Sequence, residues 1–329
     1  MENYTSKFDV HGVIVEIAAD DPEIIDILSD YLSYFKTVDG NNSDIIFKLE
    51  KHGISTYSIP EDAYWFFNYH GIAGLVHDGI YYYVSCGSVF RFDPSKLIVK
   101  ASVTSELISN RRIFTHMLFT IVLMETLRYQ GLYFLHGAGL AGPNGTSLVV
   151  TGDGASGKTT LTIALIRLGW RWLTDDTLLL KTGSAGLELF PFWREFHIPA
   201  GLAERIEELR FLLDKSAYSP SGTKRSLRGE TLYGDLKITS MKSPDVVLFS
   251  RIVDSPSSRV EKVKALDAVN EIIRNSPLVL FSQPPAKAHL EALKALVENA
   301  VCYRLYSGRD VFEDPTGGVS GILRLIGMD

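Results

Sequence analysis

The stretch that decides the fold lies near the middle of the chain and reads Gly152-Asp153-Gly154-Ala155-Ser156-Gly157-Lys158-Thr159. It fits the phosphate-binding pattern G-x-x-x-x-G-K-[ST]. Glycines let the backbone curl so that successive N–H groups point at phosphate oxygens. The lysine brings a point charge to the β- and γ-phosphates, and the final hydroxyl can ligate Mg²⁺. The pattern therefore predicts an ATP site formed by residues 152–160, with Thr160 as its last member.

The residues on either side of this loop support the prediction. Residues 147–151 (Ser-Leu-Val-Val-Thr) form a short apolar run that suits a buried strand. In residues 160–168, Leu161, Leu165 and Leu168 recur at helical spacing, and Gly169 follows as a stop. A helix here presents its positive end to a bound anion. The alternative, a glycine-rich turn that matches by chance, is disfavoured by these flanks.

Composition excludes several classes of protein. The chain has 329 residues, of which 46% are hydrophobic and 22% charged, as is ordinary for a globular protein. Its net charge of −6 argues against nucleic-acid binding. The longest uncharged apolar stretch, residues 113–124, is too short to cross a membrane, and the N-terminus lacks the apolar core of a signal peptide. We therefore expect neither nucleic-acid nor membrane partners, and a homo-oligomer stays open.

Cysteine usage indicates the compartment. The two cysteines, Cys86 and Cys302, are too few for a disulfide framework, and neither has metal-ligand spacing. We expect a cytoplasmic protein.

The periodicity predicts two regions. Residues 1–104 should form a small α+β region with antiparallel strands, beginning with a strand at 8–18 and a helix capped by Asp21. Residues 105–329 should form an α/β core, because strands and helices alternate after residue 130. In this core we expect a long helix at 105–129, strands at 170–181 and 245–253, a helix at 286–300, and a mobile loop at 216–228.

An acidic pair, Asp175 and Asp176, lies inside the apolar segment that follows the loop's helix. Two carboxylates with apolar residues on both sides are costly unless they are paired or bind a metal. Side chains alternate along a strand, so both reach one site only if the strand ends or bends there. The alternative is an exposed loop with two solvated carboxylates.

Phosphoryl transfer explains why a carboxylate pair should lie near a phosphate loop. A metal needs an acidic ligand beside the phosphates, and the attacking hydroxyl needs an acceptor for its proton. One carboxylate can serve each need. The pair begins only 17 residues after Lys158 (175 − 158), whereas the acidic metal residue of ordinary P-loop enzymes usually follows a later strand.

The block from His136-Gly137 through the loop to Asp175-Asp176 resembles the HPr kinase/phosphorylase-like kinases, relatives of phosphoenolpyruvate carboxykinase. The resemblance implies an α/β fold with an HPr kinase/PEP carboxykinase-like P-loop core that uses ATP and Mg²⁺. It also implies that Asp175 is the base toward a serine hydroxyl, that Asp176 and Thr159 hold the metal, and that His136 lies beside the transferred phosphate.

Softer similarity extends downstream. The segments 191–198 and 306–310 look similar to HPr-kinase-related proteins of peptide natural-product pathways, among them the kinases of lasso peptide biosynthesis. This implies a peptide or small protein acceptor, such as the C-terminal serine of a lasso precursor. Two alternatives are a small-molecule kinase acting on free serine and a nucleotide-dependent regulatory module with no acceptor. The N-terminal region does not look like that of true HPr kinases.

The triphosphate and its transition state need more positive charge than Lys158 alone supplies. Beyond the acidic pair in the sequence, four side chains are candidates for contacts with phosphate or substrate: Arg194, His197, Lys224 and Arg225. For each of them alone, a solvated or structural role is the more frequent one.

Overall fold

The structure is a computed structural model that describes residues 4–40, 42–53, 57–217, 222–281 and 283–328. The chain divides into two compact units, Met1–Leu132 (unit 1) and Tyr133–Asp329 (unit 2). The predicted boundary is 104/105. The helical segment after residue 104 belongs instead to unit 1, because its Phe119 ring packs on Phe47 and Tyr31. None of the helices that the structure describes is long and apolar enough to cross a membrane.

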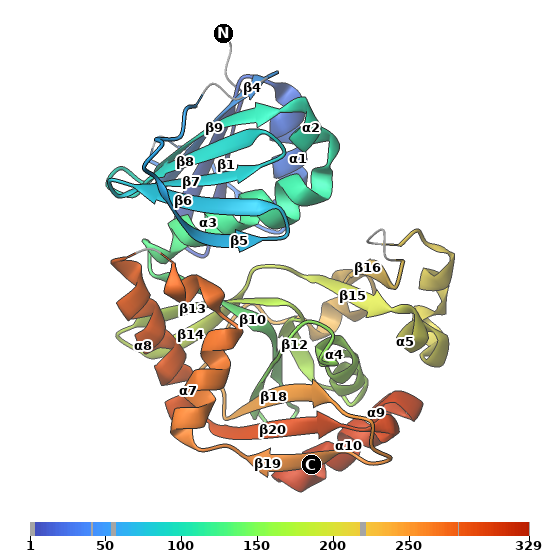
Figure 1. Ribbon diagram of the computed structural model, residues 1–329. Coiled ribbons are helices and arrows are strands. Elements are labelled where there is room, and N and C mark those ends of the chain that lie inside the picture. Colours follow the sequence, from blue (N-terminus) through green and yellow to red (C-terminus); the bar gives the residue numbers. More distant parts are fainter. Residues whose placement is uncertain (1–3, 41, 54–56, 218–221, 282, 329) are drawn as a thin grey trace. The chain divides into compact units, whose positions relative to one another are not determined.

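Unit 1 is built on one nine-stranded sheet with the order β3-β1-β2-β4-β9-β8-β7-β6-β5 (Figure 1). The neighbours β2, β4 and β9 are parallel, and the other pairs with a known register are antiparallel. Its elements are β1 (Tyr4–Val10), β2 (Val13–Ala19), α1 (Pro22–Tyr31), β3 (Lys36–Thr37), β4 (Ile45–His52), β5 (Tyr64–Tyr69), β6 (Ile72–His77), β7 (Ile80–Ser85), β8 (Ser88–Asp93), β9 (Ile98–Thr104), α2 (Ser105–Ser109), η1 (Ile113–Phe119) and α3 (Thr120–Arg128).

Two-residue turns ending in glycine make four hairpins of this sheet: β1–β2, β5–β6, β6–β7 and β7–β8. The pairs His11-Gly12, His70-Gly71, Asp78-Gly79 and Cys86-Gly87 all have positive φ at both residues. Such turns match the twist of the strands that they join. The expected single strand at 8–18 is for this reason a hairpin, β1–β2, that turns at His11-Gly12.

The helices of unit 1 follow local signals. Asp21 caps α1 by accepting a hydrogen bond from the Glu23 amide, and Pro22 opens the helix. The expected long helix at 105–129 is instead three segments: α2, the π-helix η1, and α3. At the C-terminal end of η1, the Thr120 amide donates to the Thr115 carbonyl five residues back. Such a bond fits the wider π-helical turn.

Unit 2 is a mixed α/β unit with a second nine-stranded sheet and a separate two-stranded one. The large sheet has the order β17-β14-β13-β10-β11-β18-β20-β19, and β12 also pairs with β10. Its elements are β10 (Leu132–Ala141), β11 (Ser147–Thr151), α4 (Lys158–Arg167), β12 (Arg171–Thr174), β13 (Thr177–Gly183), β14 (Gly186–Pro191), β15 (Glu195–Pro199), α5 (Ala200–Arg205), η2 (Glu207–Asp214), β16 (Lys224–Arg228), α6 (Glu230–Tyr233), η3 (Gly234–Leu236), β17 (Met241–Lys242), β18 (Val246–Ile252), β19 (Arg259–Lys262), α7 (Ala265–Arg274), η4 (Pro277–Leu280), α8 (Pro285–Glu298), β20 (Val301–Ser307), α9 (Arg309–Glu313) and α10 (Pro315–Ile326).

Helices cover both faces of the large sheet of unit 2 (Figure 1). Successive residues of β11 point into different cores. Leu148 and Val150 pack in the core that contains α4 and α10, and Val149 packs in the core that contains α7 and α8. The strands β11, β18 and β20 are parallel. The predicted strand at 147–151 and the helix after the loop are confirmed as β11 and α4.

Two expectations for unit 2 need correction. The predicted strand at 170–181 is two strands, β12 and β13, with the acidic pair between them. The predicted mobile loop at 216–228 includes a regular strand, β16, whose residues pair with β15 from Glu195↔Arg228 to Pro199↔Lys224. Residues 218–221 of that loop lie outside the described part of the chain. The strand is stabilised because its Leu227 is buried in the core that contains α4. The polar composition of residues 216–228 did not predict this contact.

Candidate functional site

The loop at 152–157 connects β11 to α4 and is shaped by left-handed backbone. Gly152, Ala155 and Gly157 have φ of +153°, +63° and +93°. A Cβ on Gly152 would collide with the Ser250 carbonyl and the Ser156 side chain. Only glycine fits that position, because it tolerates both the φ and the close approach. The loop therefore has the curled backbone that a phosphate cradle needs.

Lys158 begins α4 and is almost fully buried, at 7% exposure. Its ammonium donates to the carbonyls of Gly152 at 2.8 Å and Asp153 at 3.0 Å, so it folds back over its own loop. Burial lowers the pKa of Lys158, although the carboxylates of Asp176 and Asp175 oppose that effect. Among the described residues its hydrogen-bond partners are carbonyl oxygens, and a buried ammonium of this kind can form charge-assisted hydrogen bonds to an anion.

Ser250 supports the loop from the neighbouring strand, and sequence reasoning missed it. It is buried within the C-terminal half of β18, and its hydroxyl donates to the Ser156 carbonyl at 2.7 Å. In ordinary P-loop enzymes an acidic metal residue usually follows a strand of this kind. Here β18 continues from Phe249 into Ser250 and Arg251, and the acidic pair lies instead between β12 and β13. A serine in an apolar strand gave no signal for this role.

The acidic pair lies where the chain leaves β12 and before it enters β13 (Figure 1). The strand β12 ends at Thr174, which meets the condition that both carboxylates can reach one site only if the strand ends or bends there. The Thr159 hydroxyl donates to Asp175 Oδ2 at 2.7 Å. The loop and the first carboxylate therefore meet at the start of α4.

Asp175 is strongly desolvated. It is 4% exposed, and burial raises its pKa to about 6 even though the Thr159 hydrogen bond acts in the opposite direction. Its other oxygen, Oδ1, has no hydrogen-bond partner among the described residues. Thr162 lies close by, but its hydroxyl donates its proton to the Lys158 carbonyl. A buried carboxylate oxygen without a donor is costly in this state and suits a cation.

Asp176 has different surroundings. Its side chain is 28% exposed, and its Oδ1 lies 3.6 Å from His136 Nδ1. Burial opposes ionisation of Asp176, but His136, His197 and the Thr177 hydroxyl together outweigh it and lower the pKa. Of the two carboxylates, Asp176 is the more exposed.

Hydrogen bonds to the Asp176 carbonyl position His136 beside Asp176. The Gly137 amide and the His136 ring both hydrogen-bond to the Asp176 carbonyl, at 2.8 and 2.9 Å. A bond to a carbonyl requires the proton on Nδ1, which leaves Nε2 as an acceptor when the ring is neutral. Burial lowers the pKa of His136, despite the nearby Asp176. A Cβ on Gly137 would lie 2.9 Å from the Val150 carbonyl, which explains the glycine after this histidine.

Of the four predicted contact residues, two lie close enough to the acidic pair, His136 or Lys158 to influence a pKa there. His197 acts on Asp176, and Lys224 acts on both His136 and Lys158. Their positions on β15 and β16 place them on one face of the hairpin, because His197 pairs with Ser226 and Lys224 with Pro199. The structure thus brings a second lysine near Lys158.

The other two contact candidates are engaged elsewhere. Arg194 lies 3.6 Å from Glu230 in an ion pair. Arg225 pairs with Ile198 across the hairpin, on the opposite face from His197, and donates to the Gly222 carbonyl at 3.0 Å. No contact among the described residues brings either of them to the loop.

The chemistry of the residues at the start of α4 would suit a magnesium ion. The described part of the chain has no cluster of three or more His, Cys, Asp or Glu side chains placed to hold a metal. Mg²⁺ at nucleotide sites needs only one or two protein ligands, with phosphates and water completing its shell. Thr159 and Asp175, with its partnerless Oδ1, can supply such ligands.

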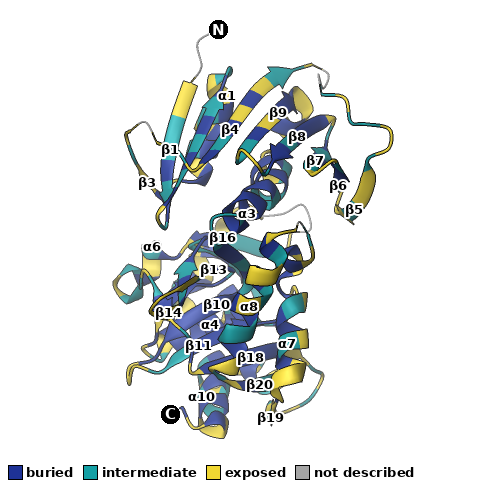
Figure 2. Cartoon of the chain, turned by 90° about the vertical axis from the view of Figure 1, so that its left-hand side faces the viewer, coloured by how far each residue is buried: buried dark blue, intermediate teal, exposed yellow. Residues whose placement is uncertain are grey.

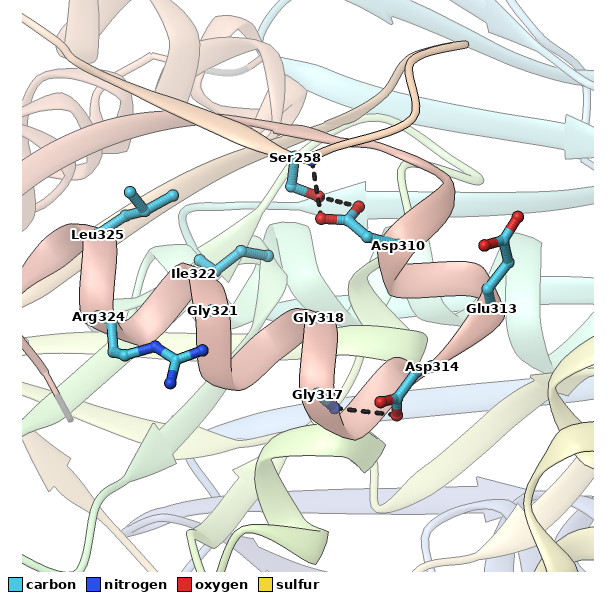
Figure 3. Close-up of a pocket in the computed structure, with 10 residues that line it drawn as sticks. All are labelled: Ser258, Asp310, Glu313, Asp314, Gly317, Gly318, Gly321, Ile322, Arg324 and Leu325. Atoms are coloured by element: carbon cyan, nitrogen blue, oxygen red, sulfur yellow. Dashed lines mark hydrogen bonds between the residues drawn. The ribbon is translucent and has the colours of Figure 1, made fainter.

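A separate pocket of about 580 Å³ lies between α9, α10 and Ser258 (Figure 3). None of the predicted site residues lines it. Two of its three acidic groups have structural tasks: Asp310 accepts from the Ser258 amide and hydroxyl at 2.8 and 2.7 Å, and Asp314 caps α10 by accepting from the Gly317 amide. We therefore place the candidate site at the loop.

Comparisons with known proteins add little to this geometry. No protein-family model matches the chain, and no curated protein matches its sequence. Among solved structures, the Hpr(Ser) kinase/phosphatase from Coxiella burnetii is similar over 40% of this chain and 72% of its own, with 17% identity and a TM-score of 0.26. A similarity of this size carries no argument about function, which has to rest on the site itself.

Proposed function

We propose that this protein is an ATP- and Mg²⁺-dependent kinase that phosphorylates a serine hydroxyl. One observation carries the proposal: the loop lysine and hydroxyl, the acidic pair and His136 converge at the start of α4. The hydrogen bond of 2.7 Å between Thr159 and Asp175 joins the two motifs directly. Phosphoryl transfer needs this combination of a phosphate cradle, a metal carboxylate and a group that positions the nucleophile.

The geometry suggests how the two carboxylates divide the work. The resemblance gave Asp175 the role of base and Asp176 that of metal ligand. We propose the reverse, because Asp175 is bonded to the metal-ligating hydroxyl of Thr159 and Asp176 is the more accessible group. The raised pKa of Asp175, about 6, favours the first assignment, since a base works best when its pKa is near the working pH. The two assignments of base and metal ligand predict different effects of the Asp175 and Asp176 variants described below.

The transfer itself balances simply. The serine Oγ forms a bond to the γ-phosphorus as the bond from that phosphorus to the bridging oxygen of ADP breaks, and the hydroxyl proton passes to a carboxylate of the pair. Lys158 leaves the carbonyls of Gly152 and Asp153 for the phosphates. Lys224 adds charge on the hairpin side. Mg²⁺ neutralises charge on the phosphates when it is bound.

The acceptor in this proposal is a peptide or small protein, such as the C-terminal serine of a lasso precursor, modified in the cytoplasm. Its support is the sequence similarity of the segments 191–198 and 306–310. Free serine as acceptor and a nucleotide-dependent module without an acceptor are the competing functions.

A transfer assay tests the function. The protein is incubated with ATP, Mg²⁺ and a panel of serine-ended peptides, free serine and small proteins, and the products are weighed by mass spectrometry. We expect a phosphate added to a peptide serine. Phosphate on free serine alone would favour the small-molecule kinase, and ADP binding with no product on any acceptor would favour the regulatory module.

Two matched variants test the roles of the carboxylates. If Asp175 holds the metal, Asp175→Asn should abolish the gain in ADP affinity that Mg²⁺ gives, and Asp176→Asn should retain that gain but lose transfer. The opposite pattern would restore the assignment that the resemblance implies. Glu313→Gln, in the remote pocket of Figure 3, is the control and should change neither quantity.

A further inference from the structure

The strand β5 forms one edge of the sheet of unit 1. It is the last strand of the sheet order, and among the described residues it pairs with β6 alone. The strand has six residues, and its sequence Tyr-Trp-Phe-Phe-Asn-Tyr contains no charge and no proline. Natural proteins usually protect such edges with lysine, proline or a covering segment. An edge of this length without charge is a template for another strand.

The aromatic side chains of β5 divide into an inner and an outer set. Phe67 lies over Gly74 of β6, where a Cβ would collide with the ring, and Phe66 packs edge-on against Tyr81 and Tyr83. These two rings anchor the strand to its sheet.

The outer set is Tyr64, Trp65 and Tyr69, which are 65%, 62% and 59% exposed. Figure 2 shows exposed residues along β5 in yellow. A bulge between Trp65 and Phe67 alters the regular alternation here. Three exposed aromatic rings within six residues exceed what the fold of the sheet needs, and tyrosine and tryptophan are the residues that most often dominate binding surfaces.

The Asp, Glu, Lys and Arg residues in the segment that carries this edge are all acidic. Residues 57–90 contain no lysine or arginine, and they contain three acidic residues, Glu61, Asp62 and Asp78. The carboxylates of Asp62 and Asp78 are 78% and 88% exposed, and His77 lies between them at 3.1 and 3.2 Å. The edge is thus aromatic and acidic, which disfavours nucleic acid and anionic lipid and suits a partner with positive charge.

We infer that β5 binds an extended segment of a partner polypeptide, rich in apolar and basic residues, as an added strand of the sheet. Backbone hydrogen bonds along the edge would give register, the three aromatic rings would contact alternate side chains, and the acidic groups would attract the basic ones. The docking site stands on unit 1 alone. Its assignment to a segment of the phosphate acceptor rests on the proposed function.

The probe is a phage-displayed library of random peptides, selected on the full-length protein. We expect the enriched peptides to alternate apolar residues and to carry net positive charge. Bound peptide should slow hydrogen exchange of amides in residues 64–69. A binding assay that needs no ATP keeps this result separate from the transfer assay, so either can fail alone.

Variants make the expectation quantitative. Trp65→Lys should weaken the selected peptides at least about tenfold, as loss of a central aromatic anchor does. The pair Asp62→Asn and Asp78→Asn leaves the strand intact and should weaken binding mainly at low salt. The control is Leu266→Lys, which replaces an apolar residue of unit 2 that is 75% exposed and should have no effect.

Three results would overturn the inference. The first is a library that yields no binder. The second is a set of binders that protect other amides or are unaffected by Trp65→Lys. The third is a concentration-dependent dimer of the protein alone that Trp65→Lys abolishes, because the edge would then pair with a second copy of the chain.

Discussion

Replacing Asp175 with asparagine should stabilise unit 2 while it removes activity. The carboxylate is 4% exposed, and burial raises its pKa from 3.8 to about 6. A shift of about two units corresponds to roughly 3 kcal/mol of unfavourable ionisation in the folded state. Asparagine has nearly the same shape, still accepts from Thr159 and carries no charge. We expect a gain of roughly 1–3 kcal/mol at pH 7.5 without nucleotide or metal.

The sign of the pH dependence follows from the direction of the shift. An acid whose pKa is raised by folding destabilises the folded state once the pH exceeds its unfolded value, and the full penalty is present above about pH 6. The advantage of Asp175→Asn should therefore shrink below pH 6 and vanish near pH 4. A gain that is equal at pH 7.5 and pH 4 would have another cause.

The assay is urea denaturation in the presence of a chelator, followed by tryptophan fluorescence. In a Trp65→Phe background the three remaining tryptophans, Trp170, Trp172 and Trp193, all report on unit 2. The reasoning is refuted if Asp175→Asn lowers the free energy of unfolding at pH 7.5. That outcome would mean that the carboxylate is stabilised by its surroundings and not held there against its solvation.

Three further predictions concern packing and buried charge. Gly137→Ala should destabilise unit 2 by about 1–3 kcal/mol in the same urea assay, because its Cβ would lie 2.9 Å from the Val150 carbonyl; an unchanged midpoint would contradict this. Trp172→Ala should cost about 3–5 kcal/mol, since the ring is fully buried and its Nε1 donates to the Tyr233 carbonyl at 2.7 Å; a loss below about 1 kcal/mol would count against it. In unit 1, Glu125 and Arg128 form an ion pair that is fully buried, so Arg128→Met alone should cost about 3–5 kcal/mol and the double variant with Glu125→Leu much less, as read from hydrogen exchange of α3; additive losses would disprove the coupling.

Local patterns predicted those parts of the fold that depend on neighbours in the chain. The strand at 147–151 and the helix after the loop were predictable because burial period, glycines and the lysine all lie within about twenty residues. The cap at Asp21 is likewise a local hydrogen bond. The hairpin turn at His11-Gly12 was not recognised, although its positive φ values are a local feature.

The prediction of unit boundaries failed for a different reason. Helical periodicity at 105–129 shows that one face is apolar, but it does not say which core receives that face. Phe119 packs on Phe47 and Tyr31, so the segment joins unit 1. The hairpin β15–β16 is similar, since Leu227 in a polar segment is buried only because the α4-side core lies beneath it.

By itself, the sequence determined the chemistry that the candidate site can offer: a glycine loop with Lys158 and Thr159, and a carboxylate pair 17 residues beyond the lysine. Only the tertiary structure decided which groups meet. In the folded chain Thr159 donates a hydrogen bond to Asp175, and the His136 ring hydrogen-bonds to the Asp176 carbonyl. Ser250 donates to the Ser156 carbonyl of the loop, and Lys224 lies close enough to influence the pKa of Lys158. The reason is physical: residue type and short spacing are fixed along the chain, whereas contacts between β10, β13, β16 and β18 depend on how distant strands pair around a common core.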